Sequence, residues 1–180
     1  MKIKNMCYVA LFAALTAVCA QITVPLAAIP FTLQTLMVTL AGLLLGPKRG
    51  AAAMTVYMLL GLAGAPVFAA FGGGLSSVAK PSFGFVLGFI PAAFVIGLIA
   101  QNGLTWLKLG AASLAGAAVT YAVGLPYMYV IIHVVNGAEA TLGNVLMWGM
   151  LPFLPGDALK IIVAIPLCLV LRRRLNYANI

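Results

Sequence analysis

The sequence contains very little charge. Of its 180 residues, 7% are charged and 64% are hydrophobic, and the mean hydropathy is +1.18. Soluble domains carry about 25% charged residues, so this chain lacks the polar surface that a water-exposed globule needs. The composition excludes a soluble domain. It also argues against nucleic-acid binding, because too few charges are free to form a basic face.

Acidic residues and phosphate-binding motifs are equally scarce. Asp157 is the only aspartate and Glu139 the only glutamate, which excludes a pair of catalytic aspartates. The chain has no GxxxxGKS or GxxxxGKT loop, so we expect that it does not itself hydrolyse ATP. Its three cysteines, Cys7, Cys19 and Cys168, lie inside apolar runs with spacings typical of neither a metal site nor a disulfide framework. We therefore expect no metal and no cofactor.

What the sequence has in abundance is long apolar runs. A membrane-spanning helix needs roughly 20 mostly apolar residues. The runs cover residues 6–26, 32–45, 51–68, 83–100, 109–133 and 146–171. Eight of the ten basic residues precede the first run or fall at every second connection: Lys2, Lys4, Lys48, Arg49, Lys108, Arg172, Arg173 and Arg174. This positive-inside pattern predicts an all-α integral membrane protein, a six-helix transmembrane bundle with both termini cytoplasmic, in a single domain over residues 1–180.

Two connections on the predicted outer side contain unusual residues. The uncharged segment 25–35 carries two prolines and Gln34, whose amide would be costly against lipid. The segment 72–84 begins with three consecutive glycines, including Gly73 and Gly74, which let the backbone approach a ligand closely. Irregular backbone at membrane depth is tolerated where it packs in protein or lines a cavity, so we expect a ligand site here. A flexible outer loop is the alternative.

Asp157 and Lys160 stand three residues apart and therefore share one face of the last predicted helix. The helical rise places Asp157 roughly 22 Å from the Arg172 end of a core about 30 Å thick, in its outer half. Charges within the membrane are costly, so both side chains should face the bundle interior. They form either a ligand site or a self-neutralising structural pair. Lys80 then meets a ligand carboxylate or lies at the surface.

The aromatic residues and the small residues each have two possible roles, one in function and one in packing. One group of aromatic side chains either walls an apolar pocket or packs the bundle: Tyr57, Tyr121, Phe68, Phe71, Phe83 and Phe85. In the first helix four alanines form two pairs at a spacing of four residues, Ala10 with Ala14 and Ala13 with Ala17. Such pairs let helices pack closely in lipid, either within the bundle or against a second protein.

Several motifs together resemble those of the BioY family. They lie between residues 6 and 171 and comprise Ile29–Gln34, Gly46–Gly50, Tyr57–Phe68, Gly72–Gly74, Pro81–Phe89 and Pro155–Lys160. One stretch departs from the family, in which a Pro-Ser/Thr-Gly-Gly-Tyr sequence tends to follow a glycine. In this chain Lys80 stands before Pro81, and Phe83, Gly84 and Phe85 follow Ser82.

The resemblance implies a biotin-binding S component of an energy-coupling factor (ECF) transporter. Such a protein is a six-helix bundle in the bacterial cell membrane that captures biotin from outside. It is not an enzyme, because a separate transmembrane coupling subunit and two ABC-type ATPases supply the energy. The expected partners are thus biotin, these subunits and membrane lipid.

The residues above and the resemblance together give a candidate site. For biotin we expect Asp157, Lys160, Lys80, Gln34, Tyr57, Gly73, Gly74, Phe83, Gly84 and Tyr121. For the coupling subunit we expect the alanines at 10, 13, 14 and 17. Three alternatives stay open: an S component for another vitamin, a membrane enzyme that acts on a lipid or peptide through Asp157 or His133, and a purely structural membrane protein.

Overall fold

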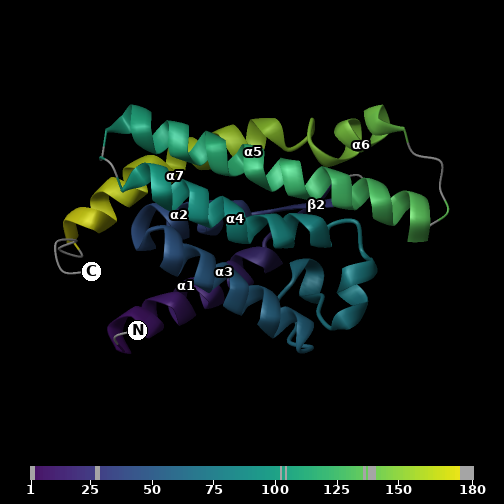
Figure 1. Cartoon of the computed structure of the whole chain (residues 1–180), viewed down its shortest axis with the longest axis horizontal. Coiled ribbons are helices and arrows are strands. Elements are labelled where there is room, and N and C mark those ends of the chain that lie inside the picture. The colour runs from purple at the N-terminus through teal and green to yellow at the C-terminus, as the bar shows by residue number, and fades with distance from the viewer. Residues whose placement is uncertain are drawn as a thin grey trace.

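The computed structural model describes residues 3–26, 29–101, 103, 105–135, 137 and 141–174. Lys2 and Glu139 lie outside these residues. The described chain is an elongated helical bundle (Figure 1). Its α-helices are α1 (Ile3–Gln21), α2 (Gln34–Leu45), α3 (Pro47–Leu62), α4 (Phe83–Ala100), α5 (Trp106–Val130), α6 (Leu142–Gly149) and α7 (Leu154–Arg174). The shorter elements are β1 (Thr23–Leu26), β2 (Ile29–Thr32), η1 (Ala69–Phe71), η2 (Leu75–Ala79) and the π-helical η3 (Ile131–Val135).

Four segments of the bundle are long and apolar enough to cross a membrane: Ile3–Gln21, Phe83–Ala100, Trp106–Val135 and Leu154–Arg172. The apolar helix α2 is shorter, with 12 residues. Large apolar side chains such as Leu11, Leu114 and Ile162 are exposed on the outside of these helices. Lipid tails are as apolar as leucine, so these surfaces suit a bilayer.

The structure has seven α-helices in its described part, where the sequence predicts six. The predicted helix 146–171 is divided into α6 and α7 by a turn over residues 150–153. Pro152 lies in this turn, and a proline lacks the N–H that a continuous helix would need. Pro155 is tolerated because it lies in the first turn of α7, where helical N–H groups have no partner in any case.

The first predicted helix, over residues 6–26, extends beyond the observed helix, because α1 ends at Gln21. Residues 23–26 form β1, which pairs antiparallel with β2 in a hairpin that places Pro25 opposite Pro30. The predicted outer loop 25–35 is thus partly this hairpin and partly the start of α2. The third predicted helix ends early, at Leu62 rather than at residue 68, because Gly64 adopts a positive φ and Pro66 follows.

Helix α4 lies at the centre of the bundle and packs against α2, α3 and α5. Its glycines allow close contacts between backbones. A Cβ atom at Gly97 would lie 2.3 Å from the nitrogen of Pro47, at the corner between α2 and α3. The largest side chains buried around α4 include Tyr57, Leu43 and Ile96. Helix α7 contacts α2 and α5, which brings its first turn next to the start of α2.

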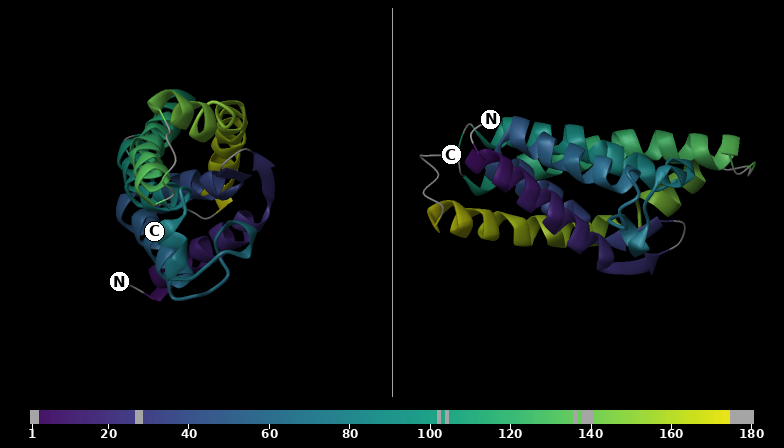
Figure 2. Two further views of the ribbon diagram at one scale, coloured as in Figure 1. Left: turned by 90° about the vertical axis from the view of Figure 1, so that its right-hand side faces the viewer. Right: turned by 90° about the horizontal axis from the view of Figure 1, so that it is seen from below.

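The two ends of the bundle differ in their elements. Helix α1 begins and α7 ends at the same end (Figure 2). The α2–α3 corner, the end of α4 and the start of α5 lie at that end too (Figure 1), and the first turns of α3 and α5 carry Lys48, Arg49 and Lys108. The hairpin, η1, η2 and α6 lie toward the opposite end. The structure therefore separates a basic end from an end with irregular backbone.

Candidate ligand-binding site

A cavity of about 380 Å³ opens in the half of the bundle that contains the hairpin. Its wall is formed by β2, α2, the segment between η1 and the start of α4, and parts of α4, α5 and α7. Small-molecule sites are typically roughly 300–1,000 Å³, with a mostly apolar wall and a few well-placed polar groups. This cavity has that size and composition.

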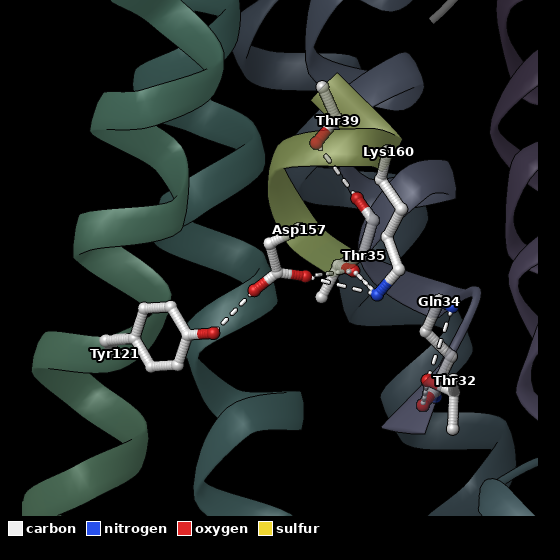
Figure 3. A network of polar contacts seen from close by, with 7 residues as sticks. All are labelled: Thr32, Gln34, Thr35, Thr39, Tyr121, Asp157 and Lys160. Atoms are coloured by element: carbon white, nitrogen blue, oxygen red, sulfur yellow. Dashed lines mark hydrogen bonds and ion pairs between the residues drawn. The ribbon is translucent and has the colours of Figure 1, made fainter. Parts of the chain in front are cut away.

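The polar centre of the cavity is an ion pair in the first turns of α7. Lys160 Nζ lies 3.1 Å from Asp157 Oδ1, and the Lys160 and Asp157 side chains are 9% and 15% exposed. Thr35, in the first turn of α2, bridges the two groups (Figure 3). Its hydroxyl oxygen accepts a hydrogen bond from Lys160 Nζ at 2.7 Å and donates one to Asp157 Oδ1 at 3.3 Å. Two helices distant in sequence therefore fix this pair.

Two further residues hold the ion pair from other sides. Tyr121 of α5 donates a hydrogen bond to Asp157 Oδ2 (Figure 3). The ring centroid of Phe31, on β2, lies 3.9 Å from Lys160 Nζ, a distance typical of a cation–π contact. The Phe153 ring stacks on Phe31 with a centroid separation of 6.1 Å. The pair is thus enclosed by α2, α5, α7 and the hairpin.

The ion pair retains hydrogen-bonding capacity for a ligand. A carboxylate offers about four acceptor positions and an ammonium offers three donors. Asp157 accepts from Thr35, Lys160 and Tyr121, while Lys160 donates to Thr35 and Asp157. Among the described residues, these bonds leave one acceptor position on Asp157 and one donor on Lys160, whose ammonium otherwise contacts only the Phe31 ring. The pair can therefore bind a group that carries both an N–H donor and a carbonyl acceptor.

A second polar cluster surrounds Gln34 at the end of the hairpin. Thr32 Oγ1 donates to Gln34 Oε1 at 2.8 Å (Figure 3), and Gln34 Nε2 donates to the Tyr57 hydroxyl. Tyr57 in turn donates to the carbonyl oxygen of Val67 at 3.0 Å. Thr32 and Gln34 line the cavity, whereas Tyr57 is fully buried behind them. Tyr57 thus supports the wall and orients Gln34.

Of the ten residues predicted for the small-molecule site, six line this one cavity: Asp157, Lys160, Lys80, Gln34, Phe83 and Tyr121. Besides Tyr57, the other three are glycines that pack against protein. Gly84 packs on Tyr127, and a Cβ at Gly73 would lie 2.3 Å from the carbonyl oxygen of Ala65. Gly74, at φ +82°, donates its N–H to the carbonyl of Gly61 at 2.7 Å.

Several residues of the cavity wall are not among those predicted from the sequence. Thr35 is the most important, because it touches both charges of the ion pair. The sequence did contain a hint of its role, because Thr32, Gln34 and Thr35 are three polar residues in segment 25–35, which also contains two prolines. Phe31 belongs to the same segment, but nothing in the sequence places its ring over Lys160.

The alanines of α1 do not share one face. Ala10 and Ala14 are exposed, whereas Ala13 is 1% exposed and Ala17 packs against the core. Within the isolated chain, only the first pair is available to a second protein. His133 is exposed on η3 with its ring stacked on Tyr129, and it does not line the cavity.

Comparisons with known proteins agree on one family. The sequence pattern of the BioY family matches residues 1–177. The biotin transporter BioY of Thermotoga maritima is 37% identical over 163 residues, which cover 91% of this chain and 92% of that protein. The biotin transporter BioY of Rhodobacter capsulatus is 36% identical over 170 residues, which cover 89% and 88%.

A solved structure has the same fold. It is the crystal structure of the S-component for biotin from an ECF-type ABC transporter, and it superimposes with a TM-score of 0.81. The match covers 96% of this chain and 92% of that chain at 26% sequence identity. The similarity therefore extends over nearly the whole bundle.

Proposed function

Because this chain belongs to the BioY family, we propose that it is the biotin-binding S component of an ECF-type vitamin importer. The observation that carries the proposal is the buried Asp157–Lys160 pair, which keeps one acceptor and one donor position in a mostly apolar cavity. Biotin carries a ureido group with two N–H donors and one carbonyl. It also has an apolar ring and chain, and a carboxylate.

The ureido group fits the ion pair chemically. Asp157 accepts a hydrogen bond from a ureido N–H, and Lys160 donates one to the ureido carbonyl. Both are charge-assisted hydrogen bonds, which are shorter and stronger than neutral ones. Thr35 and Tyr121 hold the carboxylate of Asp157 in place, so its geometry exists before the ligand arrives. Phe31, Phe68 and Phe83 line the cavity and pack the apolar ring and chain of biotin.

The charge distribution supports an orientation in the membrane. The basic end of the bundle faces the cytoplasm, where lysine and arginine accumulate in short connections. Both termini are then cytoplasmic, and the cavity opens to the outside of the bacterial cell membrane. Biotin thus enters the cavity from outside the cell, the side from which an importer takes up its vitamin.

The chain acts as a substrate-binding subunit and not as an enzyme. A transmembrane coupling subunit docks on the exposed Ala10–Ala14 pair of α1, and two ABC-type ATPases supply the energy. The small side chains of this pair allow a partner helix to approach closely.

A ligand panel tests the proposal. The detergent-purified protein is titrated with biotin, riboflavin and thiamine, and binding is followed by the rise in melting temperature. We expect a saturable rise in melting temperature with biotin and no rise with riboflavin or thiamine. A saturable rise with riboflavin or thiamine, and none with biotin, would assign the chain to another vitamin.

A further inference from the structure

The turn η2 is firmly held above the cavity. The Tyr127 hydroxyl of α5 donates to the carbonyl oxygen of Val78 at 2.6 Å. In the middle of the turn, the N–H of Ser77 donates to the carbonyl of Gly74, and the N–H of Gly74 donates to the carbonyl of Gly61 in α3. Hydrogen bonds to α3 and α5 therefore fix the backbone of η2, and with it the positions from which its side chains extend.

Ser77 is a buried polar residue with an unused hydroxyl. It is 3% exposed and lines the cavity, and its Oγ has no hydrogen-bond partner in the described part of the chain. Buried side-chain hydroxyls are nearly always hydrogen-bonded, because an unpaired one loses its bonds to water without replacement. A hydroxyl left unpaired on a cavity wall indicates a partner that enters the cavity.

Lys80 brings a positive charge to the same wall. It follows η2 directly and lines the cavity, and its Nζ lies 3.6 Å from the position that a Cβ at Gly72 would take. Among the described residues of the wall, Asp157 is the one acidic residue, and it already pairs with Lys160. The charged groups of this described wall are thus one carboxylate and two ammonium groups, which leaves one positive charge for a ligand with one negative charge.

We propose that Ser77 and Lys80 form a subsite for the ligand carboxylate, and that this subsite makes the protein selective for the free acid. The inference rests on the proposed function and adds the position of the second end of the ligand. The α7 pair binds the ureido end, and the η2 turn binds the carboxylate end. Ser77 donates its hydroxyl to one carboxylate oxygen, and the Lys80 ammonium binds the carboxylate from the mouth of the cavity, where it is exposed.

Two ligands that differ only at the carboxylate test this assignment. Biotin and biotinol, in which a CH2OH group replaces the carboxylate, are titrated by calorimetry against the detergent-purified protein and three variants. These are Lys80→Gln, Lys80→Arg and Ser77→Ala. Lys48→Gln is the control, because Lys48 is an exposed lysine at the opposite, basic end of the bundle.

We expect the unchanged protein to prefer biotin over biotinol by roughly tenfold or more, the size of one charge-assisted contact. Lys80→Gln should remove most of this preference by weakening biotin binding alone. Lys80→Arg and the control should keep it, and Ser77→Ala should reduce it in part.

Two results would overturn the subsite. One is equal affinity of the unchanged protein for biotin and biotinol. The other is a full preference for biotin in Lys80→Gln. Both leave biotin binding itself intact, whereas no binding of biotin by the unchanged protein contradicts the proposed function instead.

Discussion

Tyr121 on α5 donates its hydroxyl hydrogen bond to Asp157 on α7, so two helices that are separate in sequence share one carboxylate. The same Tyr121 ring packs edge-on against Phe85 of α4, with the ring centroids 6.2 Å apart. The hydroxyl orients the carboxylate, while the ring packs the wall. These two roles can be separated by experiment.

Tyr121→Phe keeps the ring and removes the hydroxyl. Hydrogen bonds to charged groups contribute about 1.5–3 kcal/mol, and the variant also loses the orientation of Asp157. We expect biotin to bind on the order of tenfold more weakly in a variant that remains folded, with the melting temperature of the free protein lowered by several degrees. Tyr129→Phe is the matched control, because Tyr129 stacks on His133 and does not line the cavity. Equal affinities of the two variants would remove the Tyr121 hydroxyl from the site.

Breaking the ion pair from one side should destabilise the bundle. Lys160→Met leaves the carboxylate of Asp157 in a largely apolar cavity without its cation, which typically costs about 3–5 kcal/mol. Adding Asp157→Asn removes the unpaired charge, so the double variant should melt at a higher temperature than Lys160→Met alone. Thermal unfolding in detergent measures both. If the melting temperature of Lys160→Met equals that of the unchanged protein, the ion pair does not stabilise the fold.

Gly97 sets how closely α4 approaches the α2–α3 corner. A Cβ here would lie 2.3 Å from the backbone nitrogen of Pro47, which cannot rotate away as a side chain could. Gly97→Ala should lower stability by about 1–3 kcal/mol through this overpacking. Gly110 on α5 is the control, because among the described residues its Cβ would meet only Ile165, at 3.9 Å. Gly110→Ala should be neutral or stabilising, since alanine favours a helix by about 1 kcal/mol over glycine.

The side chain of Gln21, at the end of α1, holds the loop that contains η1. Its amide donates to the carbonyl oxygens of Phe68 and Pro66, and its carbonyl accepts from the N–H of Phe71. Ala70 and Phe71 adopt φ values of 54° and 56°, a left-handed conformation that is costly for residues other than glycine. Gln21 therefore maintains a strained segment of the cavity wall.

Gln21→Leu should release this segment and raise the dissociation rate of biotin by about three- to tenfold, since the three neutral hydrogen bonds that restrain the segment are lost. Adding Ala70→Gly should restore part of the rate, because glycine adopts a positive φ without strain. Gln101→Leu, an exposed glutamine at the end of α4, is the control. Surface plasmon resonance on immobilised protein measures the rates. An unchanged rate in Gln21→Leu would show that the loop needs no such restraint.

Part of this fold could be predicted from the sequence. The limits of α4 agree with the predicted run 83–100, because polar residues and turn formers bound an uninterrupted apolar stretch. The hairpin could not be predicted, because a membrane chain is apolar in every element and the alternation that normally marks a strand is hidden. The break between α6 and α7 was visible only as Pro152, and prolines also occur inside α4, α5 and α7.

Within the site, the sequence allowed prediction only of residues whose type is rare in this chain. Asp157 and Lys160 stand out because buried charge is scarce, and their spacing of three residues brought them into contact. The role of Thr35 depends on the packing of α2 against α7, which no local pattern encodes. The glycines at 73 and 74 were expected to let the backbone approach a ligand. In the structure they instead let the loop pack closely against its neighbours.

In the proposed complex, Asp157 binds the ureido end of biotin within this cavity. Calorimetry of the purified protein and of its Asp157→Asn variant with biotin tests it most directly. We predict saturable binding at one site per chain for the unchanged protein, and affinity reduced by more than about tenfold in a variant that remains folded. Equal affinity in the folded variant would exclude Asp157 from the site, and no heat with no thermal stabilisation of the unchanged protein would exclude biotin as its ligand.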